Sequence, residues 1–380
     1  MSFCRCFLAL VCLVCVGCGE RPQTGEGDTG GVTVAEAMGG DAGGFARVTE
    51  PRPFVFPLDH GPHPDYKTEW WYLTGNVQSE TGRRFGYQLT IFRIGLIPPG
   101  SAVPRSSRWA AHEIYMGHFA ITDVQAGTFT ARERLARAAL GLAGARAQPL
   151  MVWVENWQLA GAGELFPLRI SAQDGENALD LILDTRKPVV LQGDKGFSAK
   201  SATPGNASYY YSYTRLATEG SLRVAGEHYT VRGQSWMDRE WSTSALEQNQ
   251  AGWDWFSLQL DDDTELMYYR LRRKQGGLDP ASAGAWIDHD GNTVHLGPNE
   301  VHAEVVRHWR SVLTQVRYPI EWRLSVPAQG LELAIEPLVD NQELRLTVRY
   351  WEGAVRVSGS RNGRTVSGYG YLELAGYSDE

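Results

Sequence analysis

Residues 69–93 read EWWYLTGNVQSETGRRFGYQLTIFR. Two runs in this segment, 70–77 and 85–93, are rich in the aromatic and β-branched residues that are typical of strands. Between them lies Glu80-Thr81-Gly82, a short turn of the kind that joins two antiparallel strands. The segment therefore predicts a β-hairpin.

Runs of the same kind continue at regular spacing along the chain. A first series covers residues 114–122, 152–159, 168–173, 179–185, 209–216, 222–224 and 228–232. A second series covers residues 253–260, 266–271, 286–287, 321–326, 331–335, 344–350, 354–357 and 365–374. Asn362-Gly363, before the last run, is the strongest hairpin signal in the chain. This spacing predicts an all-β protein, with an antiparallel barrel or sandwich rather than alternating strands and helices.

The two series predict two β domains, because they open in a similar way. Glu69-Trp70-Trp71 opens the first series and Gly252-Trp253-Asp254-Trp255 opens the second. We place an N-terminal domain at residues 48–245 and a C-terminal domain at 246–380. Residues 19–47 are Gly-rich and polar, and we expect them to form a flexible tether.

One segment of the first series has a helical pattern instead. Thr130-Ala131-Arg132-Glu133 has the form of a capping box, and Leu135, Ala139 and Leu142 follow at helical spacing. We therefore expect one short helix there, either packed on the barrel or acting as a lid.

The N-terminus has the pattern of an export signal. Arg5 precedes an apolar run at 7–16 that is about half the length of a membrane span. Cys15-Val16-Gly17-Cys18 resembles a bacterial lipobox, so residues 1–18 are interpreted as a lipoprotein signal peptide with Cys18 as the lipidated residue. Gly19 fits sorting to the periplasmic face of the outer membrane. The alternative is a plain signal peptide that is cleaved nearby.

Cysteine usage and charge exclude several classes of protein. All five cysteines lie in the first 18 residues, so the body has no thiol for a disulfide, a nucleophile or a thiolate metal site. The net charge is −8 and no basic run occurs, which argues against a nucleic-acid partner. Nucleotide-binding, serine-hydrolase and zinc-protease motifs are absent from the sequence. The sequence predicts neither a cofactor nor a metal site.

The segment SWMDREW at 235–241 places acids among aromatic residues. In an extended strand, Trp236, Asp238 and Glu240 share one face. Two adjacent carboxyl groups beside an indole can share a proton, or one can keep its proton near neutral pH. General-acid catalysis requires such a proton. The alternative is that both acids form ion pairs with arginines at a domain junction.

Other polar residues also have aromatic or apolar neighbours. His118 shares a strand face with apolar residues, so it is either a catalytic group or a hydrogen-bonded core residue. Glu69 and Glu155 lie beside tryptophans, where a charge is costly unless it is paired, so each is either buried and functional or at a solvent-exposed edge. Tyr210 belongs to a run of three tyrosines, a pattern that favours ordinary barrel wall over a ligand contact.

Several longer motifs resemble those of the AttH/CrtC-like lipocalin family, and they extend from about Phe54 to Tyr377. They are KTEWWYLTGN (67–76), FGYQLTIFR (85–93), HFAITD (118–123), SYYYS (208–212), WMDREW (236–241), GWDW (252–255) and GYGYLEL (368–374). The family includes carotenoid 1,2-hydratases, related hydratases and fungal lipocalin-like pericyclases. The resemblance implies two tandem lipocalin-like antiparallel barrels, with a ligand site in and beside the N-terminal barrel near the domain junction. Arg239 is a departure, because hydratase members often carry His beside the acid.

These patterns support three hypotheses of function. The first is a cofactor-free hydratase or lyase of the carotenoid 1,2-hydratase type, acting on an isoprenoid- or lipid-like alkene. The second is a non-enzymatic lipid or pigment carrier that serves a membrane transporter, and the third is a secreted hydrolase. The candidate catalytic residues are Asp238, Glu240, Glu69 and His118, and the candidate ligand-binding residues are Trp70, Trp71, Tyr87, Glu155, Trp157, Tyr210, Trp236 and Trp253.

Overall fold

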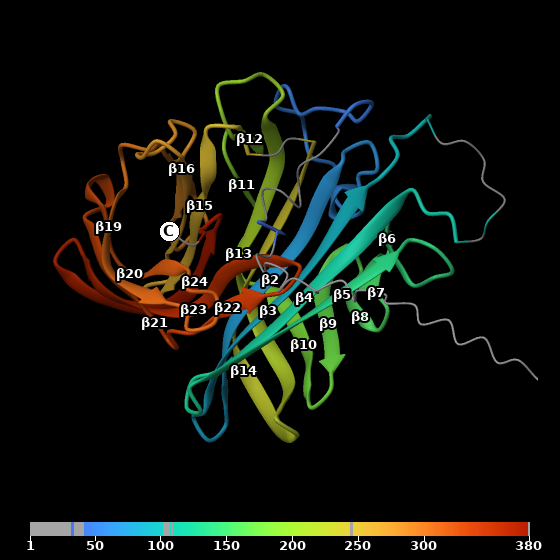
Figure 1. Ribbon diagram of the computed structural model, residues 1–380. Helices are drawn as coiled ribbons and strands as arrows, with labels where there is room; N and C mark the ends of the chain where they lie inside the picture. Colours follow the sequence, from blue (N-terminus) through green and yellow to red (C-terminus); the bar gives the residue numbers. More distant parts are fainter. Residues whose placement is uncertain (1–31, 34–41, 102–106, 108, 244–245, 379–380) are drawn as a thin grey trace, which may run out of the picture. The chain divides into compact units, whose positions relative to one another are not determined.

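The computed structural model describes residues 32–33, 42–101, 107, 109–243 and 246–378. Their strands form two antiparallel sheets, one from each half of the chain (Figure 1). The predicted all-β class with two antiparallel barrel-like sheets is confirmed. The signal peptide, Cys18 and most of the expected tether lie outside the described residues.

The first sheet curls into a nearly closed barrel. Its order is β5-β4-β3-β2-β14-β13-β10-β9-β8-β7-β6, and β4 and β5 come round to contact β6 and β7. The strands are β2 (Thr68–Ser79), β3 (Arg84–Gly95), β4 (Glu113–Asp123), β5 (Thr128–Arg137), β6 (Ala143–Ala147), β7 (Leu150–Val154), β8 (Trp157–Ala162), β9 (Leu165–Asp174), β10 (Asn177–Thr185), β13 (Ala207–Val224) and β14 (Glu227–Ser242), with β11 (Val190–Leu191) and β12 (Phe197–Ala199) beside β13.

The second sheet has the order β18-β17-β16-β15-β24-β23-β21-β20-β19. Its strands are β15 (Gln250–Leu260), β16 (Glu265–Arg273), β17 (Ala283–Ile287), β18 (Thr293–Leu296), β19 (His302–Arg310), β20 (Arg317–Val326), β21 (Leu331–Pro337), β23 (Val348–Arg361) and β24 (Arg364–Ala375), with β1 (Val32–Thr33) and β22 (Glu343–Arg345) beside β23. Strand β1 lies within the segment that was expected to be a tether, and it pairs with β23 in parallel.

The predicted hairpins form. Strands β2 and β3 pair as far as Gln78 and Arg84, around the expected turn. Strands β23 and β24 pair up to Arg361 and Arg364. The two residues between them, Asn362 and Gly363, have φ values of 50° and 77°, as a type I′ turn requires.

The helix expected after Thr130 is wrong. Residues Thr128–Arg137 form β5, which pairs with β4 along its whole length. The open edge of β4 offers ten residues of backbone hydrogen bonding, and this outweighs a local helical pattern. The helices in the described residues are the two single 3₁₀ turns η1 (Leu58–His60) and η2 (Pro327–Gln329).

Alternation along β2 shows how the core is divided. Trp71 and Leu73 point into the first barrel, whereas Trp70 and Tyr72 point toward the second sheet, because neighbouring side chains on a strand lie on opposite faces. The second sheet has a core of its own, which includes Trp322. The described chain therefore contains two barrel cores and a third apolar cluster between the sheets.

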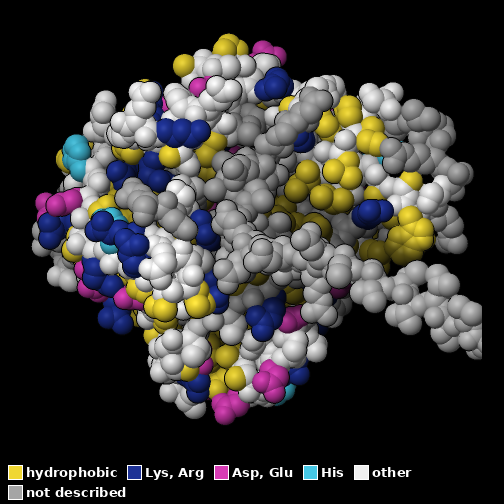
Figure 2. Space-filling model, viewed as in Figure 1, with side chains coloured by type: hydrophobic (Ala, Val, Ile, Leu, Met, Phe, Trp, Pro, Cys, Tyr) yellow, Lys and Arg dark blue, Asp and Glu magenta, His cyan; other side chains and the backbone are white. Residues whose placement is uncertain are grey.

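No helix in the described residues is long and apolar enough to cross a bilayer. Hydrophobic side chains nevertheless gather on one face of the molecule (Figure 2). The exposed large hydrophobic residues of the chain after β3 and of the chain around β5 and β6 are Leu96, Trp109, Leu135, Leu140 and Leu142.

Candidate functional site

A pocket lies between the two sheets and takes its walls from both. Trp70 and Tyr72 on β2 line it from the first sheet, and Trp253 and Trp255 on β15 line it from the second. The cavity volume is about 150 Å³, close to that of a dry cavity that binds benzene. The family resemblance implied a site in and beside the N-terminal barrel near the domain junction; the pocket lies beside that barrel and not inside it. In the described residues, that interior is filled by packed side chains such as Trp71 and Trp157.

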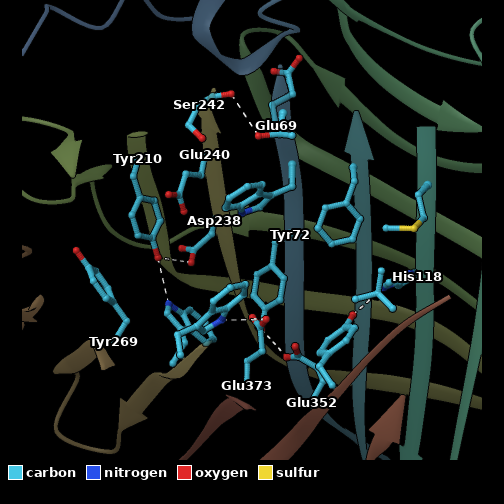
Figure 3. Close-up of a pocket in the computed structure, with 18 of the residues that line it drawn as sticks. Glu69, Tyr72, His118, Tyr210, Asp238, Glu240, Ser242, Tyr269, Glu352 and Glu373 are labelled. Atoms are coloured by element: carbon cyan, nitrogen blue, oxygen red, sulfur yellow. Dashed lines mark hydrogen bonds between the residues drawn. The ribbon is translucent and has the colours of Figure 1, made fainter. Parts of the chain in front are cut away.

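Asp238 lines the pocket (Figure 3), and within the described residues its hydrogen-bond partners are all neutral groups. The Trp236 Nε1–H donates to its Oδ1 at 2.7 Å, the Ser212 hydroxyl donates to the same oxygen at 2.6 Å, and the Tyr210 hydroxyl bonds Oδ2. Burial raises the pKa of Asp238 to about 7, although these three bonds lower it. Asp238 can therefore hold a proton near neutral pH.

Glu240 shares the strand face of Asp238, as predicted, but it has a cationic partner. The Lys200 Nζ lies 2.9 Å from its Oε1, and Ser208 donates to the same oxygen. Burial alone would lower the pKa of Lys200, but Glu240 outweighs this effect and the pKa is raised. The ammonium group also lies 5.2 and 4.6 Å from the ring centroids of Tyr210 and Tyr269. This end of the pocket therefore carries an ion pair next to a carboxyl group without a charged partner.

The second sheet adds two carboxyl groups that sequence reasoning missed. Glu352 on β23 and Glu373 on β24 are directly opposite in register. Tyr72 donates to Glu352 at 2.6 Å, and Trp253 donates to Glu373 at 3.1 Å. Burial raises the pKa of Glu373 to about 8, and burial together with Glu373 raises the pKa of Glu352 well above its usual range. The sequence signal was an acid inside an apolar run, as in Leu372-Glu373-Leu374.

Glu69 lines the pocket but cannot act as a proton donor. Arg93 and Arg239 both bond its carboxylate, and the His63 backbone N–H adds a bond of 3.0 Å. Burial alone would raise the pKa of Glu69, but Arg239 and Arg93 hold it well below its usual range. Arg239 stands where hydratase members of the family often carry His, and its guanidinium group holds Glu69 in place as a carboxylate.

The remaining candidates separate into two groups. His118, Trp70, Tyr210 and Trp253 line the pocket. Five others do not line it, so their expected ligand contacts are corrected. Trp236 is one of them, and its indole N–H donates to Asp238. Trp71, Tyr87 and Trp157 belong to the packed core of the first barrel, and Glu155 lies on a surface turn 3.2 Å from Arg134.

The fold and this site define a class: a protein of two lipocalin-like β domains with a carboxyl-lined pocket between them. The chain belongs to the AttH-like family, whose model matches residues 47–377. The structure is similar to that of an AttH homologue from Nitrosomonas europaea, at 36% identity and a TM-score of 0.78, over 88% of this chain and 100% of that one.

Two more distant structures share the fold. Kievitone hydratase from Nectria haematococca has a TM-score of 0.66 at 17% identity, over 88% of this chain and 98% of its own. CghA, solved with Sch210972, has a TM-score of 0.52 at 15% identity, over 83% and 89% of the two chains. Comparison with curated proteins by sequence gives no match.

Proposed function

We propose that the chain is a cofactor-free hydratase that adds water to a carbon–carbon double bond of a hydrophobic, isoprenoid- or lipid-like molecule. One observation carries this proposal. Asp238 combines a pKa of about 7 with a position on the wall of an aromatic pocket. An acid in this state can give a proton to an alkene carbon at neutral pH.

The pocket residues support the two halves of a hydration. As the proton of Asp238 forms the new C–H bond, the π electron pair is consumed and a cation develops on the adjacent carbon. The rings of Trp70, Trp253 and Tyr72 line the cavity, and aromatic faces stabilise a desolvated cation. A water molecule then forms the C–O bond and loses one proton. Asp238 is reprotonated from solvent after product leaves, so the atoms balance.

The fold relatives add support of a coarser kind. One protein of the same fold is a hydratase by name, and another has been solved with a small molecule. Their identity to this chain is below a fifth, so the choice of reaction depends on Asp238 and the choice of substrate class on the aromatic walls.

The test measures hydration of a panel of isoprenoid alkenes in H₂¹⁸O by mass spectrometry. We expect ¹⁸O in a product alcohol, and at least a roughly 100-fold lower rate in Asp238→Asn, the usual scale for a lost general acid. Asp123→Asn is the matched control, because Asp123 is a buried carboxyl on the first sheet that does not line the pocket. A folded Asp238→Asn protein with full turnover would remove the mechanism.

Carriage of an unaltered lipid or pigment is the alternative use of this pocket. Burying the carboxyl groups of Asp238, Glu352 and Glu373 costs free energy, and a carrier of an apolar molecule does not need them. Organic extraction of the purified protein distinguishes the two. A bound lipid that is recovered unchanged after incubation would favour a carrier, with a membrane transporter as its partner.

We also propose that the chain is anchored by lipid at Cys18, on the periplasmic face of the outer membrane. The support is the sequence pattern of residues 1–18, together with the absence of any later cysteine. Metabolic labelling with an alkyne fatty acid should mark the wild-type chain and leave Cys18→Ser unlabelled. Labelling of both would overturn the assignment.

A further inference from the structure

His118 joins the inner end of the pocket to the protein surface. Its Nδ1 lies 2.7 Å from the hydroxyl of Tyr350, and its Nε2 lies 3.2 Å from a carboxylate oxygen of Glu133. His118 is fully buried on β4, Glu133 lies opposite it on β5, and Tyr350 comes from β23 of the second sheet. Three side chains from three strands thus form one continuous chain of hydrogen bonds.

The hydrogen bonds of this network can all run in one direction, from the pocket to Glu133. The Gln88 amide donates to the Tyr350 oxygen at 3.0 Å, so the hydroxyl hydrogen of Tyr350 is free to go to the Nδ1 of His118. A neutral imidazole that accepts at Nδ1 carries its hydrogen on Nε2, and this hydrogen faces Glu133. We assign this tautomer to His118, because in it every hydrogen bond of the network has a donor and an acceptor and runs from the pocket to Glu133.

A proton path needs access to solvent at one end and to the pocket at the other, and this hydrogen-bond network has both. At the outer end, 17% of the Glu133 side chain is exposed, and the exposed Thr347 donates to it at 2.6 Å. Burial alone would raise the pKa of Glu133, but the bond to His118 outweighs it and the pKa is lowered, so Glu133 is an anion at neutral pH.

At the other end of this network, Tyr350 and Gln88 line the pocket together with Glu352. The Oε1 of Gln88 and the Oε2 of Glu352 are buried without a hydrogen-bond partner in the described part of the chain. Buried polar atoms in this state are uncommon, and both suit a bound water or hydroxyl group.

We propose that Tyr350, His118 and Glu133 form a proton path that takes the proton released by the attacking water from the pocket to solvent. The path rests on the proposed hydration and assigns its second proton transfer. As the water oxygen bonds the cationic carbon, its hydrogen goes to the Tyr350 oxygen and the Tyr350 hydrogen goes to His118 Nδ1. The imidazolium then gives its Nε2 proton to Glu133, which passes it to solvent, and His118 is left protonated at Nδ1. After product leaves, Nε2 takes a proton back from solvent through Glu133, and Nδ1 gives its proton through Tyr350 to water in the emptied pocket, which restores the Nε2–H tautomer. Tyr350 contacts the reacting water, whereas His118 and Glu133 act through it.

The path can be tested without the natural substrate. 2-Naphthol is a small aromatic photoacid whose anion emits at longer wavelength than the neutral molecule, so its emission reports whether an acceptor takes the proton. The measurement uses an Asp238→Asn background at neutral pH, which removes the carboxyl group that the hydration proposal uses. Glu69 and Glu240 also line the pocket and stay in every variant, so the comparison between variants isolates the path. We expect anion emission from bound 2-naphthol in this background, and its loss when Tyr350→Phe or Glu133→Gln is added.

The controls separate a proton path from a structural contact. Tyr371→Phe removes the hydroxyl of another buried tyrosine that does not line the pocket, and it should leave the emission unchanged. Anion emission that persists in Tyr350→Phe, or that is absent from the background protein, would overturn the path. Because Asp238 is absent throughout, failure of the proposed acid leaves this result unaffected.

A second measurement decides the matter if 2-naphthol does not bind. In ¹⁵N-histidine NMR, with His118 assigned through His118→Gln, we expect a single tautomer that is protonated at Nε2. Tyr350→Phe should shift the Nδ1 resonance to that of an unbonded nitrogen, and Glu133→Gln should speed the exchange of the Nε2 proton. An Nδ1-protonated His118, or one that ignores both substitutions, would refute the path.

Discussion

At the scale of single residues, partners decide what three carboxyl groups of one pocket can do. Glu69 lies between two guanidinium groups and keeps its charge. Glu240 is paired with Lys200. Asp238 accepts hydrogen bonds from an indole and from hydroxyl groups. Neutral donors do not offset the cost of burying its charge, so Asp238 alone of these three is suited to carry a proton.

The raised pKa of Asp238 predicts a pH-dependent stability. The pKa of Asp238 rises from about 3.8 in the unfolded chain to about 7 in the folded protein, so between these pH values the folded state binds more protons than the unfolded state. The resulting contribution to the free energy of unfolding is complete below pH 3.8. It is lost as the pH rises through 7, by roughly 4 kcal/mol at most. Asp238→Asn should lack this loss and become the more stable protein above neutral pH.

Urea unfolding of both proteins at a series of pH values checks this prediction. The difference between them isolates Asp238 from the other buried acids, which titrate in both. A difference that stays constant from mildly acidic to mildly alkaline pH would show that Asp238 is ionised throughout, and it would also weaken its role as an acid.

At the scale of elements, strand alternation could be predicted and strand partners could not. The faces of β14 follow from a period of two residues, which is why Asp238 and Glu240 were correctly placed together. The segment of β5 carries helical signals, and only its pairing with β4 makes it a strand. That pairing also brings Glu133 opposite His118, a contact that no local pattern reveals.

Side chains of β5 close the gap to the far edge of the barrel. Arg134 lies 4.6 Å from the ring centroid of Trp157 and donates to the Gln173 carbonyl at 3.0 Å. Arg132, two residues away on the same face, pairs with Asp174 but is about half exposed. We expect Arg134→Ala to cost about 1 kcal/mol, and Arg132→Ala less than about 0.5 kcal/mol.

Hydrogen exchange at the β5 amides, together with urea unfolding, measures both substitutions. Faster exchange in Arg134→Ala, confined to β5 and its neighbours, would identify Arg134 as the closing contact. Equal effects of the two substitutions would mean that general surface charge, rather than this contact, holds the strand.

At the scale of the whole molecule, the pocket exists because two halves of the chain meet. Tyr72 donates to Glu352 although 280 positions separate them. The sequence predicted the family, the two β series and the acid on β14, since these depend on local pattern. Local pattern could not indicate that the cavity lies between the sheets, because that depends on which strand faces pack against each other; only the family resemblance pointed to the domain junction.

A buried ion cluster also joins the sheets, beside the shared apolar residues. Glu265 on β16 accepts from Lys187 at 2.9 Å and from Arg215 on β13. All three side chains are almost fully buried. Glu265 is the buried anion of the cluster, and the exposed Asp263 lies 3.6 Å from Arg215. Removing the buried anion leaves two buried cations, which typically costs about 3–5 kcal/mol.

Glu265→Gln should therefore separate the unfolding of the two sheets. Each sheet has its own core, so loss of the joint leaves two units that can melt independently. Calorimetry should show one transition in the wild-type protein and two in Glu265→Gln.

Glu343→Gln is the matched control, because Glu343 is also buried but its partners Ser311, Thr314 and Tyr318 all belong to the second half of the chain. It should lower the melting temperature without splitting the transition. A single, unshifted transition in Glu265→Gln would mean that apolar packing at the pocket is enough to hold the sheets together.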